Sequence, residues 1–221
     1  MCMKIKAIIF DLDGVLIDSE PILHNARIRI AENYGKLWSY EDHVNILGTS
    51  AIYCAEYMIK KLELRVPAKA LVNEVNEYTV ASYKENIPFR SGAVEVVRLL
   101  SDRYPLALAS GSPKEILEII TNSQEFESLF DVVVSSEELR EGKPNPEIFL
   151  EAARRLRVEP DECVCIEDSA NGVLAGRRAN MFVINIPDPM FPLNKDESSN
   201  ANMILNSLKE LHDGTLSLIE T

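Results

Sequence analysis

The chain has 221 residues and a formal net charge of −12, with 46% hydrophobic and 26% charged residues. These proportions are typical of globular proteins and exclude a disordered chain, a fibrous repeat and a small disulfide-built domain. The acidic balance and the lack of a dense basic run argue against nucleic acid or an anionic membrane surface as the main partner. A small phosphorylated substrate stays compatible with this charge, because a bound metal ion can reverse the local field.

The cysteine pattern and the amino-terminal segment indicate a protein of a reducing compartment. Cys2, Cys54, Cys163 and Cys165 follow no zinc-ligand or redox spacing, so buried reduced thiols are expected. The chain runs directly into a strand-like segment without a signal-peptide pattern, and no apolar run approaches membrane-spanning length. We therefore expect a cytoplasmic protein.

Short apolar, β-branched runs recur along the chain and predict the buried strands of a parallel sheet. In chain order they are Ile5–Phe10, Leu106–Ala109, Val132–Val134, Cys163–Ile166 and Phe182–Ile186, with a weaker run at Met203–Leu205. From residue 92 onward helical patterns alternate with them, at Ala93–Arg103, Lys114–Thr121, Pro146–Leu156 and about Asn171–Ala179. This alternation predicts a doubly wound α/β domain with right-handed crossovers.

Residues 18–88 break the alternation and contain helical patterns only. These patterns cover Glu20–Tyr34, Glu41–Leu47, Ala51–Leu64 and Ala68–Glu85. Pro88 and the pair Ser91-Gly92 mark the exit from the segment. We expect an all-helical cap of about 70 residues, inserted after the first strand of a core formed by residues 1–17 and 89–221. The stretch Pro187–Asn202 is expected to be a surface loop.

The first predicted strand runs into the motif Phe10-Asp11-Leu12-Asp13-Gly14. In an extended chain, side chains two residues apart point the same way, so Asp11 and Asp13 should converge, and Gly14 allows the backbone to turn away. Paired carboxylates suit a hard divalent cation such as Mg²⁺. An EF-hand calcium loop is excluded because its later acidic ligands are missing. The motif alone remains compatible with two solvated acids at a strand end.

Two further segments carry groups that suit phosphate. Ser110 ends the second apolar run and is followed by Gly111, so a hydroxyl and free backbone N–H groups could hold phosphate oxygens there. The same sequence is also compatible with an ordinary turn or helix cap. Lys143 has glycine and proline as its neighbours, which stiffen the loop. It is either a fixed cation for phosphate or a solvated surface charge.

A third strand end carries the segment Glu167-Asp168-Ser169. It either caps the next helix or supplies further oxygens for a metal ion. Asp11, Ser110 and Asp168 each stand at the carboxyl end of a different predicted parallel strand, where open α/β sheets bind ligands. Their joint occurrence favours a functional site over coincidence.

With these residues the sequence resembles the haloacid dehalogenase-like superfamily, in the branch of β-phosphoglucomutase and related sugar phosphatases. The four motifs of that family occur in order, and the resemblance covers essentially the whole chain. It implies a Rossmann-like catalytic core with a helical cap that sets substrate specificity. It also implies that Asp11 is the nucleophile and forms an aspartyl-phosphate. Asp13 would be the general acid and base and would lend its backbone carbonyl to the metal.

The resemblance assigns the remaining core residues as well. Ser110, Gly111 and Lys143 would hold the transferring phosphoryl group. Asp168 would complete the Mg²⁺ site, with Glu167 helping directly or through water. Mg²⁺ and a charged lysine would neutralise the phosphoryl oxygens, which is the main requirement of such a transition state.

Differences between this sequence and the similar subfamilies narrow the range of expected activities. True dehalogenases and phosphonatases lack an aspartate at the position of Asp13. The β-phosphoglucomutases carry Lys-Gly-Val-Ser-Arg in the cap loop, where this chain has Leu47-Gly48-Thr49-Ser50-Ala51. The two charges that would hold a second phosphate are therefore absent. A gating histidine of the mutases aligns with Leu23, and His24 lies about 100° further around a helix. The opening Asp18-Ser19-Glu20-Pro21 resembles the phosphatases instead.

We therefore expect a Mg²⁺-dependent phosphatase that acts on a small sugar or polyol phosphomonoester. A phosphosugar mutase is the alternative, a catalytically silent metal-binding regulatory protein is less favoured, and a redox role for Cys163 and Cys165 is more distant. Five cap residues are candidates to face the leaving group, although each taken alone is more typical of an ordinary surface residue: Glu20, His24, Asn45, Thr49 and Ser50. The expected partner is a small phosphorylated metabolite, and the expected state is a monomer or weak dimer.

Overall fold

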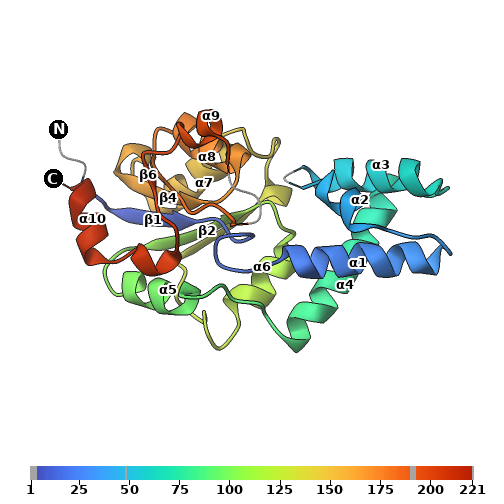
Figure 1. Ribbon diagram of the computed structural model, residues 1–221. Helices are drawn as coiled ribbons and strands as arrows, with labels where there is room; N and C mark the ends of the chain where they lie inside the picture. Colours follow the sequence, from blue (N-terminus) through green and yellow to red (C-terminus); the bar gives the residue numbers. More distant parts are fainter. Residues whose placement is uncertain (1–3, 48, 190–192, 221) are drawn as a thin grey trace. The chain divides into compact units, whose positions relative to one another are not determined.

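The computed structural model describes residues 4–47, 49–189 and 193–220, so Cys2 and Gly48 lie outside the described ranges. Its centre is a parallel sheet in the order β3-β2-β1-β4-β5-β6 (Figure 1). The strands are β1 (Ala7–Phe10), β2 (Leu106–Ser110), β3 (Val132–Ser135), β4 (Cys163–Glu167), β5 (Phe182–Asn185) and β6 (Met203–Ile204). The predicted doubly wound α/β fold is confirmed.

The strands are apolar because helices cover the sheet on both faces. All residues of β1, β2 and β4 are buried. The strands β2 and β4 extend one residue further than expected, since Ser110 still pairs with Ser135 and Glu167 with Asn185. The apolar pattern stops before these residues, but the backbone ladder continues. Buried polar side chains therefore line the carboxyl edge of the sheet.

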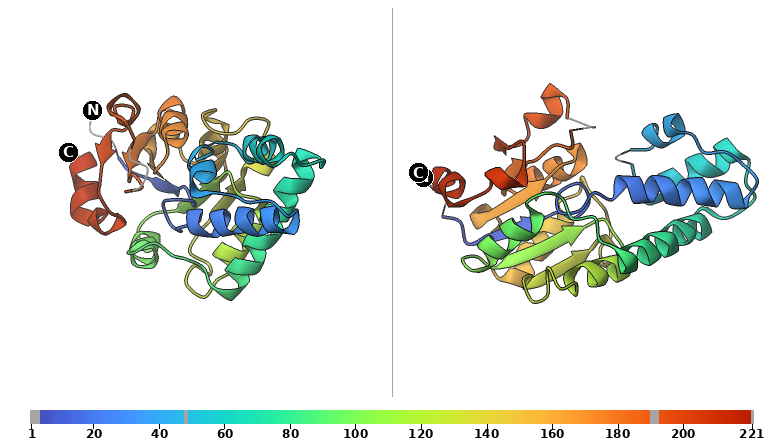
Figure 2. Two further views of the ribbon diagram at one scale, coloured as in Figure 1. Left: turned by 45° about the vertical axis from the view of Figure 1, so that its right-hand side comes forward. Right: turned by 60° about the horizontal axis from the view of Figure 1, so that its bottom comes forward.

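Helices α7 and α8 lie on one face of the sheet and α5 on the other, as Figure 1 and the turned views of Figure 2 show. The helices of this part are α5 (Ala93–Ser101), α6 (Lys114–Thr121), α7 (Glu147–Leu156), α8 (Ala170–Arg178), α9 (Lys195–Ser198) and α10 (Asp213–Ile219), with the 3₁₀ turns η1 (Ser136–Glu138), η2 (Pro160–Glu162) and η3 (Leu208–Glu210). The expectation of a plain loop at 187–202 is wrong, because α9 forms there. Asn194 and Glu197 make a reciprocal capping box that stabilises this short helix.

One core cluster joins β1, β2 and β4 to α7 and α8. Phe149 of α7 is fully buried in it. Cys163 and Cys165 belong to the same cluster and are also fully buried. Burial, with nearby acidic residues as a smaller cause, raises the pKa of the Cys163 thiol to about 12. A protonated and inaccessible thiol is a poor nucleophile, which argues against the redox alternative.

The chain divides into two compact units, residues 1–18 with 88–221 and residues 19–87. The boundaries differ by one residue from those expected. The smaller unit contains α1 (Glu20–Asn33), α2 (Tyr40–Val44), α3 (Ala51–Leu62) and α4 (Ala68–Glu85). Its core forms where α4 packs on α1 and α3 around buried apolar side chains that include Trp38, Met58 and Leu71.

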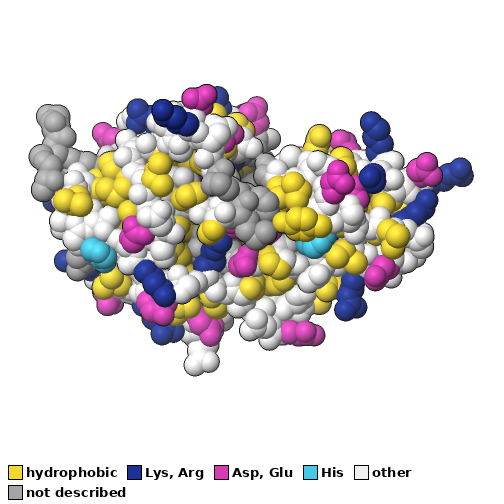
Figure 3. Space-filling model, in the orientation of Figure 1, with side chains coloured by type: hydrophobic (Ala, Val, Ile, Leu, Met, Phe, Trp, Pro, Cys, Tyr) yellow, Lys and Arg dark blue, Asp and Glu magenta, His cyan; other side chains and the backbone are white. Residues whose placement is uncertain are grey.

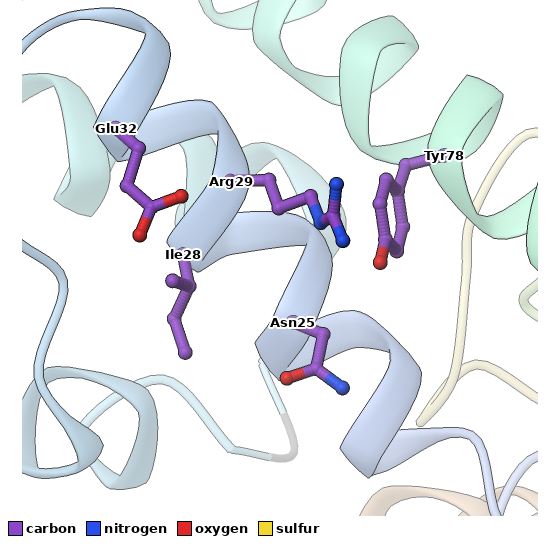
Figure 4. A pocket seen from close by; sticks show the side chains of 5 residues that line it. All are labelled: Asn25, Ile28, Arg29, Glu32 and Tyr78. Carbon is purple, nitrogen blue, oxygen red and sulfur yellow. The ribbon is translucent and has the colours of Figure 1, made fainter.

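The smaller unit also has an open groove between α1 and α4 (Figure 4). Its lining residues are Asn25, Ile28, Arg29, Glu32 and Tyr78. Two of the lining residues form a cation–π contact, because the Arg29 guanidinium lies 5.7 Å from the centroid of the Tyr78 ring. None of the predicted cap residues lines it.

The surface carries charges of both signs. On the face drawn in Figure 3, acidic and basic side chains are interspersed with apolar ones. Within the described ranges, no helix has the length and apolar character needed to cross a membrane.

Truncation of Phe149 tests the packing of this core. Phe149→Ala should lower the free energy of unfolding by about 3–5 kcal/mol, because it leaves a cavity beneath the sheet. Urea denaturation followed by circular dichroism measures the loss. Leu150 is the matched control, since it follows Phe149 on the same helix and is 40% exposed. Leu150→Ala should cost less than about 1 kcal/mol, and equal losses for the two variants would contradict this packing.

Candidate active site

The polar residues at the carboxyl ends of three neighbouring strands come together at one edge of the sheet. Asp11 follows β1, Ser110 ends β2, and Glu167 ends β4 with Asp168 next to it. Because the three strands are parallel and adjacent, these ends lie side by side. Lys143 reaches the same place from the loop before α7, and the structure thereby brings the predicted core residues together.

Lys143 is a largely enclosed cation at the centre of the cluster. Its Nζ donates to Asp11 Oδ1 at 2.5 Å, to Glu167 Oε1 at 2.6 Å and to the carbonyl oxygen of Ala109 at 3.3 Å. The side chain is 14% exposed, and its Nζ lies 5.0 Å from the centroid of the Phe149 ring. Burial alone would disfavour the charge, but Asp11 and Glu167 together raise the pKa of Lys143 above its usual value. The reading of Lys143 as a solvated surface charge is wrong.

Glu167 is fully buried, and both of its carboxylate oxygens accept hydrogen bonds. Its Oε2 accepts hydrogen bonds from the backbone N–H groups of Asp168 and Ser169, at 3.0 and 3.2 Å, and from the Ser169 hydroxyl at 3.1 Å. A Cβ on Gly172 would lie 1.8 Å from Glu167 Oε1, so only glycine leaves space for this carboxylate. Ser169 also caps α8 by accepting from Gly172 N–H. The capping interpretation of this segment is therefore confirmed for Ser169, whereas the metal-ligand interpretation of Glu167 and Asp168 stays a prediction.

Three carboxylates could hold a metal ion. Asp11, Glu167 and Asp168 each offer an oxygen, and these oxygens lie within 4.8 Å of one another. Burial raises the pKa of Asp11 to about 8, with Lys143 opposing the shift and Glu167 and Asp13 adding to it. Burial and the charges of Glu167 and Asp11 likewise raise the pKa of Asp168 well above its usual value. A buried acidic set with one lysine suits a divalent cation, since the cation would stabilise the ionised forms.

Gly14 forms the turn that leaves the site. Its φ of +77° lies in the left-handed region, and a Cβ there would lie 1.9 Å from Asp168 Oδ2. The backbone of the turn therefore packs directly against a predicted metal ligand. Both the conformation and the close approach require glycine at this position.

The carboxylate of Asp13 is held by two hydroxyls. Ser112 Oγ donates to Asp13 Oδ2 at 2.6 Å, and Ser110 Oγ lies at 3.3 Å from the same oxygen. Ser110 also accepts from the backbone N–H of Ser112 at 3.0 Å. The sequence analysis did not single out Ser112. Its position two residues after Ser110 was the available signal, because such a pair can present both hydroxyls to one group.

In the smaller unit, two of the five cap candidates, Glu20 and His24, are half-buried and contact the buried side chains of Arg27 and His43. Glu20 Oε2 lies 3.4 Å from His43 Nε2 and 3.9 Å from Arg27 Nη1, and that Arg27 nitrogen lies 3.0 Å from His43 Nδ1. The His24 ring lies 4.3 Å from the His43 ring. Burial, with Arg27 and His24 as further causes, lowers the pKa of His43 to about 4, so it is neutral at pH 7. Sequence analysis missed Arg27 and His43, which pattern alone assigns to a helix face.

The other three cap candidates lie around the start of α3. Asn45 Nδ2 donates to the Tyr57 hydroxyl at 3.2 Å. Thr49 Oγ1 donates to the carbonyl oxygen of Ile46 at 2.6 Å. Ser50 caps α3 by accepting from Tyr53 N–H. All three are exposed, and the hydrogen bonds just described stabilise local structure. Their contact with a substrate stays a prediction.

Substitution of Gly14 tests the link between the turn and the carboxylates. Gly14→Ala adds a Cβ at a positive φ and displaces the Asp168 carboxylate, so we expect Mg²⁺ affinity to fall at least about tenfold, which corresponds to about 1.4 kcal/mol. Isothermal titration calorimetry measures the affinity. Gly142→Ala is the control, because its Cβ would meet nothing within 4 Å. Unchanged binding in Gly14→Ala would show that Asp168 does not hold the cation.

Similar known proteins include a bifunctional kinase/phosphatase, a phosphatase and a mutase. The chain is 34% identical over 211 residues to the bifunctional riboflavin kinase/FMN phosphatase of Arabidopsis thaliana; the match covers 93% of this chain and spans about half, 54%, of that relative. It is 32% identical to hexitol phosphatase B of Escherichia coli K12, with 94% and 95% of the two chains covered. The crystal structure of β-phosphoglucomutase from Clostridium difficile is similar with a TM-score of 0.79 at 25% identity, covering 98% and 97% of the chains.

The family assignment rests on most of the chain. Residues 5–180 match the haloacid dehalogenase-like hydrolase family. This range includes β1, the helical unit and all the carboxylates, hydroxyls and the lysine of the site. The motifs of the sequence, the parallel sheet and the gathered strand ends agree with that match. The chain therefore belongs to the haloacid dehalogenase-like hydrolases.

Proposed function

We propose that this protein is a Mg²⁺-dependent phosphatase that hydrolyses a small sugar or polyol phosphomonoester through an aspartyl-phosphate on Asp11. One observation carries the proposal. Lys143 holds the Asp11 carboxylate at 2.5 Å, while Asp13, two residues away, has its carboxylate held separately by Ser112 at 2.6 Å. Two carboxylates in unlike surroundings can take unlike roles in one reaction.

Asp11, Asp168 and the backbone carbonyl of Asp13 are the groups proposed to hold Mg²⁺, with Glu167 beside them. The cation supplies positive charge to the oxygens of the transferring phosphoryl group when it is bound. Glu167 already accepts hydrogen bonds from its own turn and from Lys143. We therefore propose that the main role of Glu167 is to position Lys143 and the turn at Asp168 and Ser169.

The chemistry divides into two displacements at phosphorus. A carboxylate oxygen of Asp11 forms a bond to phosphorus while the ester P–O bond breaks, and Asp13 gives its proton to the departing alcohol oxygen. Asp13 then takes a proton from a water molecule that attacks phosphorus and releases Asp11. Lys143, Ser110 and the backbone at Gly111 would hold the phosphoryl oxygens during both steps. The charged lysine stabilises the negative charge of the transition state.

The substrate class follows from the relatives and from the lack of charge in the cap loop. The relatives are named for hexitol and FMN phosphatase activities. Leu47 and Ala51 stand where a mutase-like loop would have cations for a second phosphate. A neutral, hydroxyl-bearing leaving group fits this composition. Glu20, His24 and the exposed Asn45 are the proposed cap contacts to its hydroxyls, together with Thr49 and Ser50.

A phosphosugar mutase is the second candidate, favoured by the similarity to a β-phosphoglucomutase structure. The uncharged positions 47 and 51 oppose it. A catalytically silent protein is opposed by the complete set of carboxylates and the buried lysine. We further propose a cytoplasmic protein that acts on a small phosphorylated metabolite as a monomer or weak dimer. Its net charge of −12 is unfavourable for nucleic acid or an anionic membrane as a partner.

Replacement of the nucleophile tests the proposed function. The protein should release phosphate from sugar and polyol phosphates with Mg²⁺, and Asp11→Asn should lower kcat by at least about 10³-fold, because an amide cannot form the acyl-phosphate. The measurement is phosphate release from a panel of phosphomonoesters. Chelation of Mg²⁺ should abolish release as well.

The same panel separates the phosphatase from its alternatives. It includes β-glucose 1-phosphate with a trace of the 1,6-bisphosphate, assayed for glucose 6-phosphate. Isomerisation with little phosphate release would contradict the phosphatase and favour the mutase. Release that persists in Asp11→Asn would exclude Asp11 as the nucleophile.

A further inference from the structure

The segment that leads back from the helical unit pairs with the turn that follows Asp13. Phe89 forms an antiparallel bridge with Ile17, and the backbone N–H of Arg90 donates to the carbonyl oxygen of Leu16 at 2.9 Å. Gly14 N–H donates in turn to Ile17 at 2.9 Å. Arg90 is therefore fixed by its own backbone within reach of the turn at Gly14.

The side chain of Arg90 connects this turn to a second loop of the site. Its Nη1 donates to the carbonyl oxygen of Gly14, and its Nη2 lies 2.9 Å from Asp188 Oδ2. The side chains of Arg90 and Asp188 are only 22% and 14% exposed. Hydrogen bonds that involve a charged donor are stronger than neutral ones, and partial burial reduces their screening.

The loop that carries Asp188 is hydrogen-bonded to the end of β4, where Glu167 and Asp168 lie. Just before it, Ile186 N–H donates to the carbonyl oxygen of Glu167 at 2.8 Å. Asn185 Nδ2 donates to the same oxygen at 3.0 Å and to that of Asp168 at 3.3 Å. Arg90 thus joins three segments: the turn after β1, the return from the helical unit, and the loop after β5.

The bond from Arg90 reaches Gly14, whose backbone position affects both Asp13 and Asp168. Gly14 follows Asp13 directly, and the position of its missing Cβ is 1.9 Å from Asp168 Oδ2. Glycine has no side chain with which to fix its own turn, and its backbone has the widest conformational choice. A bond to its carbonyl oxygen limits that choice and thereby limits where the Asp13 carboxylate can point.

We propose that Arg90 is a positioning residue that acts through the Asp13–Gly14 turn and sets the proton transfer to the leaving group. The proposal rests on the phosphatase function proposed above. Arg90 acts through the backbone, because its side chain donates to the carbonyl oxygen of Gly14 and to Asp188. The alternative is that the Arg90–Asp188 ion pair contributes only to the stability of the fold.

The test compares two leaving groups. An alkyl phosphate needs a proton on its departing oxygen, whereas p-nitrophenyl phosphate releases a stable phenolate and needs little help. For Arg90→Met we expect kcat/KM to fall by about 10- to 100-fold on the alkyl phosphate and by less than about threefold on p-nitrophenyl phosphate. Arg90→Lys should recover only part of the loss, because an ammonium lacks the two-sided geometry of the guanidinium. Arg98→Met is the control, since Arg98 also donates to a backbone carbonyl but is exposed on α5.

The outcomes separate this proposal from the proposed function. Equal losses on the two substrates, or no loss, would overturn the positioning role. Amide hydrogen exchange of residues 14–17 gives a readout that needs no activity, and it should be faster in Arg90→Met than in Arg98→Met. If the unsubstituted protein releases no phosphate from either compound, the proposed function fails, and unchanged exchange would then overturn the proposal independently. Asp188→Asn provides a second variant with the same expected pattern in case Arg90→Met does not fold.

Discussion

The contact between Lys143, Asp11 and Glu167 is the interaction on which the site depends. One ammonium lies at 2.5 and 2.6 Å from two carboxylates that are almost fully enclosed by protein. Removing one partner of such a buried set leaves an uncompensated charge, which is strongly destabilising. The ends of β1 and β4 and the loop before α7 are therefore held in one arrangement by their charges. The same arrangement brings the proposed nucleophile Asp11, the ammonium of Lys143 and the proposed metal ligands together at one edge of the sheet.

Two glycines next to the site leave space for its carboxylates. Gly14 and Gly172 leave room for Asp168 and Glu167, respectively, at distances where any Cβ would collide with a carboxylate oxygen. Three neighbouring carboxylates with one lysine leave the site short of positive charge, and burial raises the pKa of Asp11 to about 8. A divalent cation relieves that shortage. Binding of the proposed metal ion would therefore be coupled to the structure of the turns through electrostatics and steric fit.

Sequence reasoning located the strand ends because burial on both faces makes each strand an apolar run, and the first polar residue after the run marks its end. Asp11 and Glu167 were found in this way, and Asp168 directly follows Glu167. Ser112 and Arg90 were not, because their bonds to Asp13 and Gly14 cross 99 and 76 residues of chain and have no local pattern. The short helices α9 and α10 were missed for a related reason. Caps and packing, rather than periodicity, stabilise helices of that length.

The central claim is that Asp11 accepts the phosphoryl group, and a rapid-quench experiment tests it most directly. The protein is mixed with Mg²⁺ and a substrate labelled on phosphorus, quenched in acid within milliseconds, and digested. The account predicts a transient label on the peptide that contains Asp11, stable in acid and released by hydroxylamine, as an acyl-phosphate requires. Phosphate release with no protein-bound label at any time, or a label on a peptide without Asp11, would contradict it.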